Sequence, residues 1–283
     1  MRGYTLPPGN VQICFSGGRT SAYMLHQILA VSGDFPDRVK VVFTNTGREM
    51  PETLDFVQEC SHQWSVPVTW VEGRPHNEVS QRFEIVNHNS ASRNGEPFEQ
   101  VIRKKKYLPN QQARFCTAEL KVRPARDYLC SLGWSRWTSA LGIRADEPRR
   151  VNRVPPKERW VNWYPLADGQ IDKYVVMKFW ENHPFDLGLG VVKGNSALGN
   201  CDGCFLKSEA TLAMLARDYP ERHQWWEDME ALASKLTANV NGATFRKDQS
   251  RAALGKFVER QGDWIFDDEN GALCQADDGE CTG

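Results

Sequence analysis

The pattern of apolar and polar residues changes period repeatedly over the first 75 residues. Apolar residues alternate with small or polar ones over residues 11–15, and residues 20–31 carry apolar side chains at helical spacing. A β-branched run at 39–43, a helix opening at Pro51 and a third strand over 66–71 follow. This order predicts a parallel sheet with covering helices, and right-handed crossovers would bring the strand ends to one crevice.

Beyond this segment the pattern is interrupted and then resumes. Residues 74–113 are polar and rich in Asn, Arg and Ser, which predicts a partly helical insertion over the crevice. Apolar periodicity then predicts a helix over residues 120–132, a strand over 137–143 and a helix over 171–182. The charged, Pro-containing residues 144–159 are expected to form a loop and not a linker between independent domains.

The C-terminal third is expected to be mostly helical after a glycine-rich loop at 188–203. We therefore predict an α/β fold with a doubly wound, mostly parallel sheet and helices on both faces, in a domain over residues 1–200. A helical region over residues 201–266 opens with a C-x-x-C motif. The acidic residues 267–283 are expected to form a mobile tail.

Composition excludes a global attraction to polyanions. The 283 residues are 40% hydrophobic and 25% charged with a formal charge of −1, so a nucleic acid or a membrane surface would have to be met by a local patch. No stretch approaches the roughly 20 apolar residues of a membrane span, and the first residues lack the apolar core of a signal peptide. We expect a cytoplasmic protein without a membrane partner. Its ten dispersed tryptophans are interpreted as core anchors.

The first candidate site is a glycine-rich turn between the first strand and the first helix. Such a turn presents backbone N–H groups and the positive end of the helix dipole, which suits phosphate. The turn matches neither the Walker loop nor the Rossmann fingerprint, and a simple tight turn is the alternative. The candidate nucleotide-binding residues are Ser16, Gly17, Gly18, Arg19, Thr20 and Ser21.

Five sequence blocks together carry a family resemblance. Ser-Gly-Gly-x-x-Ser at residues 16–21 resembles the pyrophosphate loop of the N-type ATP pyrophosphatases, the PP-loop or adenine nucleotide alpha hydrolase-like superfamily. Residues 45–53, with Asn-Thr-Gly and Pro-Glu-Thr, are similar to the phosphoadenosine phosphosulfate (PAPS) reductase branch of that group, and so are blocks at 114–124, 142–149 and 164–166. Each block is weak alone, but their shared order makes the chain resemble the PAPS reductase family.

The resemblance implies an enzyme that binds ATP or an adenosine phosphosulfate, with Mg²⁺ accompanying ATP. Asn45, Thr46 and Gly47 would lie at the carboxyl edge of the second strand, where an adenosine can rest against the backbone. Arg144 follows a later strand and is a candidate for neutralising a phosphate or sulfate oxygen in catalysis. The alternative for Arg144 is an ion pair with a neighbouring acidic residue.

The second candidate site is a group of cysteines. The C-x-x-C motif of Cys201 and Cys204 allows two thiolates to converge on one metal centre. Cys116 stands where cluster-containing relatives carry a cysteine pair, so the resemblance implies a 4Fe-4S cluster with Cys281 or Cys274 as fourth ligand, or with one open iron. Zinc is the alternative metal. The remaining thiols, Cys14, Cys60 and Cys130, are interpreted as buried fillers.

The tail offers a possible nucleophile. The end of the chain, with Glu280 and Cys281, is similar to the reductases' terminal Glu-Cys-Gly segment, whose cysteine attacks sulfur. An exposed, mobile thiol suits such a role, whereas acidic neighbours disfavour the thiolate. An unstructured tail without function is the alternative.

Three functional hypotheses follow. The favoured one is ATP-dependent adenylation and sulfur transfer, because the pyrophosphate loop is intact. The second is a PAPS or adenosine phosphosulfate reductase that forms sulfite with Cys281 as the nucleophile. The third is a non-catalytic nucleotide-binding protein.

The expected partners depend on the same hypotheses. The basic run Arg103–Lys106 is where a nucleic acid acceptor would lie, although a solvated loop is the commoner explanation of such a run. A thiol reductant or a sulfur-donor protein is a further expected partner, and a homo-oligomer is left open. The residues do not distinguish a cellular from a viral protein.

Overall fold

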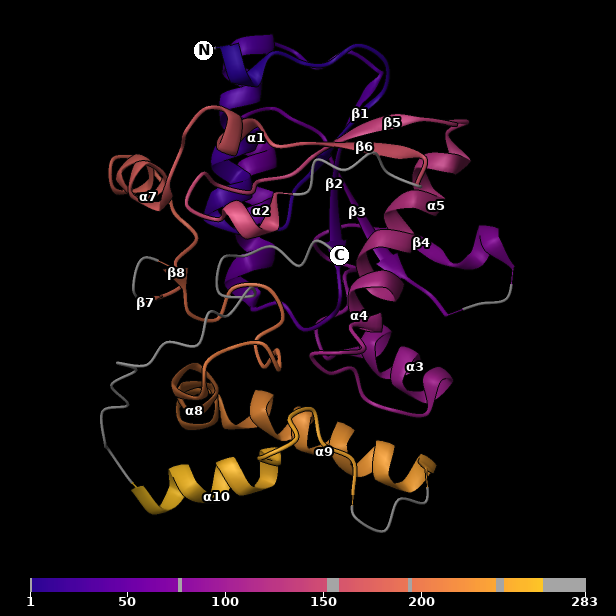
Figure 1. The fold of residues 1–283 in the computed structure, drawn as a ribbon, viewed down its shortest axis with the longest axis vertical. Helices are drawn as coiled ribbons and strands as arrows, with labels where there is room; N and C mark the ends of the chain where they lie inside the picture. Colours follow the sequence, from indigo (N-terminus) through magenta and orange to yellow (C-terminus); the bar gives the residue numbers. More distant parts are fainter. Residues whose placement is uncertain (1, 76–77, 152–157, 193–194, 238–241, 262–283) are drawn as a thin grey trace.

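The computed structural model describes residues 2–75, 78–151, 158–192, 195–237 and 242–261. A six-stranded sheet lies at the centre of the chain with helices on both faces (Figure 1). Its strands are β1 (Val11–Cys14), β2 (Val39–Asn45), β3 (Val68–Gly73), β4 (Phe83–Val86), β5 (Trp137–Ala140) and β6 (Trp160–Trp163). A separate hairpin consists of β7 (Val191–Val192) and β8 (Asn195–Ser196).

The strand order creates a switch point beside β1. The order is β4-β3-β2-β1-β5-β6, and all neighbouring strands are parallel except the pair β3 and β4. Ile13 of β1 pairs with Val41 of β2 on one side and with Ala140 of β5 on the other. The chain therefore builds the sheet outward from β1 in one direction and then in the other, and ligands bind at such a point beyond the carboxyl ends of the strands.

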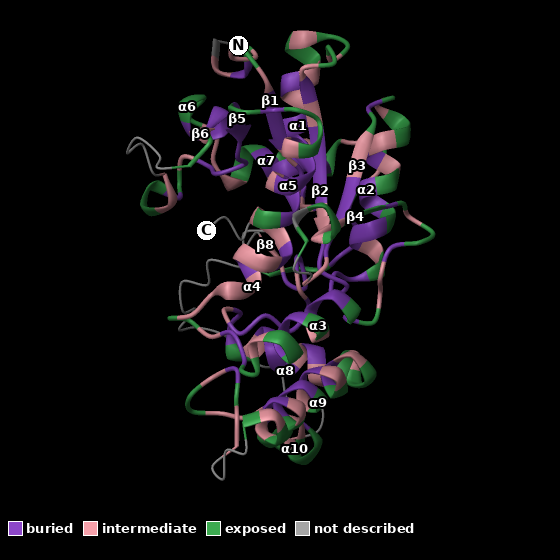
Figure 2. Cartoon of the chain, turned by 90° about the vertical axis from the view of Figure 1, so that its right-hand side faces the viewer, coloured by how far each residue is buried: buried purple, intermediate pink, exposed green. Residues whose placement is uncertain are grey.

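Alternating side chains supply two cores, one on each face of the sheet. Val41 and Phe43 pack with the helices α1 (Arg19–Ser32), α2 (Pro51–Gln63) and α7 (Lys173–Glu181). The short helix α6 (Pro165–Asp168) precedes α7 in the chain. Val42, which points the other way, packs with Leu129 of α5 (Arg123–Ser131). Figure 2 shows the buried residues concentrated along β1 and β2 between these helices.

A third group of helices lies beyond the carboxyl edge of the sheet (Figure 1). Helix α3 (Glu96–Lys105) contacts α9 (Pro220–Thr237), and α9 packs with α8 (Glu209–Asp218) and α10 (Arg251–Gln261). Trp226 of α9 is fully buried against Phe98 of α3, with their ring centroids 5.5 Å apart. The helical C-terminal region is thus packed onto the polar insertion.

The predicted mostly parallel sheet with helices on both faces is confirmed, and two strands were missed. The insertion at 74–113 contains the antiparallel edge strand β4 as well as α3, and the predicted loop at 144–159 is followed at once by β6. Both are four-residue edge strands with exposed residues such as Ile85 and Val161, and each lies within or directly after a polar or charged segment that predicts an insertion or a loop. The predicted mobile tail lies outside the described residues.

No helix in the described part of the chain combines the length and the apolar character that crossing a membrane requires.

Candidate functional site

The turn between β1 and α1 is closed by two serine side chains. The backbone N–H of Ser16 donates to the Ser21 hydroxyl (3.2 Å), the two hydroxyl oxygens are 2.9 Å apart, and the Ser21 hydroxyl donates to the Gly18 carbonyl (3.0 Å). Gly18 is the N-cap of α1, and no side-chain hydrogen bond caps this end of the helix. The N–H groups of the first turn thus point toward the carboxyl edge of the sheet, where an anion is favoured.

Gly17 allows this turn to approach the second helix. Its φ is +79°, and a Cβ placed there would lie 2.7 Å from the Thr53 methyl group of α2 and 3.2 Å from the Phe43 ring. A side chain at this position would therefore combine backbone strain with a steric conflict. The Pro-Glu-Thr block and the glycine turn, separate in sequence, form one packed unit.

Arg19 and Arg144 both lie beside the turn, and both make buried contacts. The Arg19 guanidinium donates to Asp186 (Nε to Oδ1, 2.6 Å) and to the Ser196 hydroxyl (2.7 Å), so it holds the hairpin segment against α1. Arg144, only 3% exposed, donates to Asp146 (2.9 Å) and reaches the Thr20 hydroxyl (3.2 Å). The ion pair that was the alternative for Arg144 therefore occurs, and the guanidinium also lies beside the turn.

The end of β2 is organised by buried carboxylates. The Asn45 amide donates to Glu72 (2.6 Å) and its oxygen accepts from the Gly47 N–H (3.2 Å). The Thr46 N–H and hydroxyl both donate to Glu49 (2.9 Å each), a residue to which the sequence analysis assigned no role. These bonds fix the turn after β2 and leave its backbone at the edge of the sheet.

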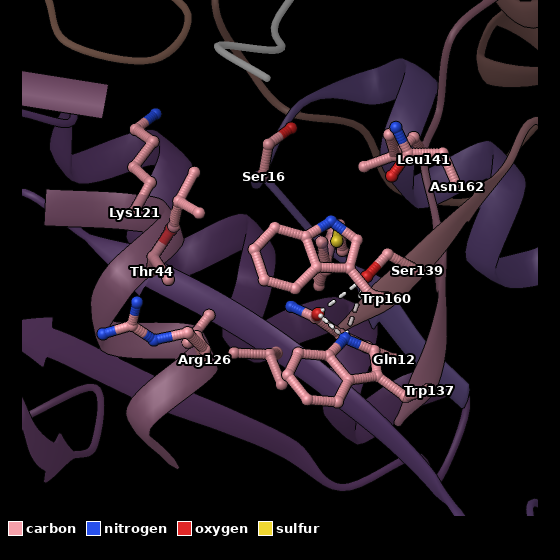
Figure 3. Close-up of a pocket in the computed structure, with 15 residues that line it drawn as sticks. Gln12, Ser16, Thr44, Lys121, Arg126, Trp137, Ser139, Leu141, Trp160 and Asn162 are labelled. Atoms are coloured by element: carbon pink, nitrogen blue, oxygen red, sulfur yellow. Dashed lines mark hydrogen bonds between the residues drawn. The ribbon is translucent and has the colours of Figure 1, made fainter. Parts of the chain in front are cut away.

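A cleft opens at the switch point beside Ser16 (Figure 3). The space between its lining side chains and its open mouth is about 820 Å³, part of which is open solvent. Figure 3 shows Lys121 and Arg126 on one side of Ser16 and Trp160 and Asn162 on the other. Cations beside an apolar wall suit a ligand with a phosphate group and a planar ring.

Two tryptophans line this cleft while they also pack in a core cluster, as their interpretation as core anchors predicts. Trp137 and Trp160 are stacked with centroids 5.5 Å apart at 20°. Beneath them the Gln12 side-chain oxygen accepts from the Trp137 indole N–H (3.2 Å) and the Ser139 hydroxyl (3.1 Å). The sequence pattern predicts that Trp137 lies on a strand, but it does not predict that the rings of both tryptophans also line a cleft.

Three of the predicted metal ligands gather in one small pocket. Cys116, Cys201 and Cys204 line it together with Thr46, whose hydroxyl lies 3.2 Å from the Cys201 sulfur. They come from α4 (Phe115–Thr117) and from the segment before α8, which the fold brings to the carboxyl edge of β2. Among the described residues no set of three or more Cys, His, Asp or Glu is arranged to hold a metal ion.

The C-x-x-C loop is anchored by its own aspartate. Asp202 is fully buried and accepts from Arg48 (2.8 Å), from Arg222 and from the Trp226 indole N–H (2.8 Å). A Cβ on Gly203 would lie 2.3 Å from the Trp226 indole nitrogen, so the loop packs closely on α9. The sequence singled out the two cysteines and missed this anchor, because its partners are 20 to 154 residues away.

Buried cations lie next to both thiols of the motif. Burial lowers the pKa of Arg48, while the charges of Asp202 and Cys201 oppose that change. Burial likewise lowers the pKa of Arg251 to about 10, against the opposing charges of Glu230 and Cys204. A positive charge close to a thiol stabilises negative charge on its sulfur, which suits a metal ligand or a nucleophile.

A π-helical turn (Ala118–Val122) connects the two sites. Lys121 of this turn lines both the cleft and the three-cysteine pocket, and its ammonium lies 3.4 Å from the Asn200 side-chain oxygen. Such turns are frequent at functional sites. Lys121 belongs to the block at residues 114–124 that carries part of the family resemblance, but the sequence did not indicate a role for it.

The other predicted cysteines are dispersed. Cys60 is fully buried as expected, whereas Cys14 is only half-buried and lines the cleft, and Cys130 is half-buried at the end of α5. The interpretation as buried fillers therefore holds for Cys60, whereas Cys14 and Cys130 pack against the core but keep part of their surface exposed. The predicted nucleophile and fourth ligand Cys281, and its alternative Cys274, lie outside the described residues.

Comparison with known proteins places the chain in a family. Residues 10–168 match the model of the phosphoadenosine phosphosulfate reductase domain. Two relatives are uncharacterized phage proteins: nin region protein ORF290 of Escherichia phage lambda, and a 37.8 kDa protein in the gpa 5' region of Escherichia phage 186. The phage lambda protein is 32% identical in sequence, and the match covers 73% of this chain and 69% of the relative. The phage 186 protein is 22% identical, and the match covers 87% of this chain and 82% of the relative.

Among solved structures, the chain resembles a PAPS reductase from Candida auris in complex with phosphate. The TM-score is 0.40 with 16% identity, over 66% of this chain and 81% of that one. The family model, by contrast, matches the described sheet from β1 to β6 and more than half of the chain. The chain therefore belongs to the phosphoadenosine phosphosulfate reductase domain family, within the PP-loop superfamily.

Proposed function

We propose that this protein binds an adenine nucleotide in the cleft at the switch point and uses ATP to adenylate an acceptor for sulfur transfer. The observation that carries the proposal is the intact serine-glycine turn at the N-terminus of α1, beside a pocket lined by three thiols. Family membership supports a sulfur- or nucleotide-directed enzyme. The intact turn favours the cleavage of ATP between its α and β phosphates.

The protein groups needed for that cleavage are present in the turn. The backbone N–H groups at the start of α1 and the Ser16 hydroxyl would cradle the departing pyrophosphate, and Ser21 bonds to Ser16. Arg144, next to Thr20, would neutralise a phosphate oxygen. Lys121, which lines the cleft, would contribute a second positive charge.

The proposed reaction has two balanced steps. First, an acceptor oxygen attacks the α-phosphorus of ATP, the bond to the bridging oxygen breaks, and pyrophosphate leaves with that electron pair. Second, a donor of sulfide-level sulfur forms a C–S bond at the acceptor carbon, the C–O bond breaks, AMP leaves, and the sulfide proton passes to solvent. Neither step consumes an oxidant or a reductant.

The three-cysteine pocket is proposed to hold an iron–sulfur cluster through Cys116, Cys201 and Cys204, with zinc as the alternative. The support is the convergence of three thiols from two segments and the anchoring of their loop by Asp202. A cluster with three cysteine ligands would supply an iron atom with an open coordination position. The chain's own contribution is to keep the thiols together and to place buried guanidinium groups beside them.

The test is turnover of purified protein with ATP and, separately, with each phosphosulfate. Pyrophosphate release from ATP is the expected result, and Ser16→Ala should reduce it by about two orders of magnitude while the exposed Ser135→Ala does not. Sulfite release from a phosphosulfate, abolished in Cys281→Ser, would replace the proposal with the reductase hypothesis that family membership also supports. Nucleotide binding without turnover would leave a non-catalytic binding protein.

The cluster has a separate test. Iron and acid-labile sulfide should co-purify with the protein, with visible absorption that is lost in Cys116→Ser. The half-buried Cys130→Ser is the matched control and should keep both. Stoichiometric zinc in place of iron would remove the iron part of the proposal.

A further inference from the structure

The surface beside the three-cysteine pocket combines aromatic rings with cations. Tyr107, 43% exposed, lies edge-on to the half-buried Phe115 with ring centroids 4.7 Å apart at 68°. The Lys105 ammonium lies 5.9 Å from the centroid of the Phe115 ring. We call Tyr107, Phe115 and the cations of residues 103–126 the aromatic-basic platform.

The platform carries a local charge that the whole chain lacks. Residues 103–126 contain eight Lys and Arg side chains and one acidic residue, Glu119, in a protein with a formal charge of −1. Two further carboxylates pair with these cations, Glu99 with Arg103 and Asp127 with Arg126, so the cations still outnumber the carboxylates. Helix α3 ends in this run, and Lys104 and Lys106 are exposed there. The local excess of positive charge is what a polyphosphate backbone requires.

Glu119 holds two of these cations in place. Its carboxylate contacts the Lys105 ammonium (2.8 Å) and the Arg123 guanidinium (2.5 Å). Although burial opposes its ionisation, these two cations keep the pKa of Glu119 below its usual value. The carboxylate therefore orders α3 and the π-helical turn relative to each other and still leaves the platform strongly positive.

The platform adjoins the site where sulfur chemistry is proposed. Phe115 directly precedes Cys116, so their Cα atoms are about 3.8 Å apart. Cys116 and Lys121 line the three-cysteine pocket, and Lys121 also lines the nucleotide cleft. A planar group that rests on Tyr107 thus lies beside Phe115, the residue that precedes Cys116 of the three-cysteine pocket.

We infer that the platform binds a single-stranded nucleic acid, with an unpaired base on the Tyr107 ring and the backbone along the cations, and that this nucleic acid is the sulfur acceptor. This inference rests on the proposed function for the acceptor role. A single strand is favoured over a duplex because only an unstacked base offers its face to an aromatic ring. An acidic peptide would satisfy the charges but would leave the exposed ring without a stacking partner.

Binding is tested by fluorescence anisotropy with labelled oligonucleotides of one mixed sequence, as single-stranded RNA, single-stranded DNA and duplex. We expect a single strand to bind more tightly than the duplex, and the two single-stranded probes to identify the sugar. Tyr107→Ala should weaken binding about tenfold while Tyr107→Phe retains it. Tyr174→Ala, at a tyrosine on α7 that is 72% exposed, is the matched control and should bind like the unchanged protein.

Three results would overturn the inference: equal or tighter binding of the duplex, equal affinities of Tyr107→Ala and Tyr174→Ala, or full competition by polyglutamate. Circular dichroism of both variants verifies that they fold. Failure of the proposed function gives a different pattern, in which oligonucleotides bind as expected but do not stimulate pyrophosphate release from ATP. Stimulated release that is the same for Tyr107→Ala and the unchanged protein would remove the acceptor role alone.

Discussion

The serine-glycine turn and the three-cysteine pocket are built in opposite ways. The turn is one continuous segment, residues 16–21, whose serines and glycines bond to one another. The pocket takes its thiols from residues 116, 201 and 204, and its anchor Asp202 has partners in the turn after β2 and in α9. A local motif can form its geometry from its own residues, whereas a pocket of distant residues depends on the packing of the whole domain.

The energetic consequence is a difference in vulnerability. The turn is stabilised by hydrogen bonds worth about 1 kcal/mol each. The pocket depends on a fully buried carboxylate with two guanidinium partners, and the removal of one member leaves uncompensated buried charge. Substitutions in the two regions should therefore differ in how far their effects spread.

The largest expected effect is that of Asp202→Ala. Because Arg48 would be left buried without its partner, the free energy of unfolding should fall by about 3–5 kcal/mol in a urea titration. Asp218→Ala removes an exposed partner of Arg217 and should cost below about 1 kcal/mol. Equal losses for the two variants would contradict the role of Asp202 as an anchor.

Gly203→Ala should come second. A methyl group there meets the Trp226 indole, so overpacking should lower the free energy of unfolding by about 1–3 kcal/mol and disturb the indole's bond to Asp202. Gly190→Ala adds the same methyl group in open space and serves as the control. Intrinsic tryptophan fluorescence should change in the first variant and not in the second.

Gly17→Ala tests the turn itself. Gly17 and Gly9 share a φ of +79°, so alanine at either position should introduce a similar backbone strain of about 1–2 kcal/mol. Only at Gly17 does the methyl group meet a neighbour, the Thr53 side chain. ATP affinity, measured by calorimetry, should fall at least about tenfold for Gly17→Ala and stay unchanged for Gly9→Ala, while the three-cysteine pocket remains intact.

The smallest expected effect is a pH dependence of stability. Burial and the neighbouring His183 lower the pKa of His26, a residue of α1 whose ring packs against Phe179 of α7. The folded state therefore binds fewer protons than the unfolded state, so stability is complete above pH about 6.5 and declines as the pH falls below that value. His26→Phe should flatten this decline in urea titrations, whereas substitution of the exposed His62 by Gln is the control and should leave the decline as it is.

Much of the fold follows from local pattern. The inner strands β1, β2, β3 and β5 lie between helical segments, and their pattern indicates both their type and their order along the chain. The edge strands β4 and β6 escaped detection because each is four residues long and lies within or directly after a polar or charged segment. The helical region after residue 204 was expected from composition, but its packing on α3 was not.

The features of the candidate site also fall into two groups, those predicted from local sequence and those that depend on tertiary packing. By itself the sequence determined the position of the glycine turn at the end of β1 and the proximity of the Cys201 and Cys204 thiols, because both depend on residues a few positions apart. Only the tertiary structure decided that Cys116 joins this pair, that Asp202 anchors it and that two tryptophans line the cleft. The physical reason is that these contacts join segments far apart in the chain, and their energy is gained only when the sheet and the C-terminal helices have packed together.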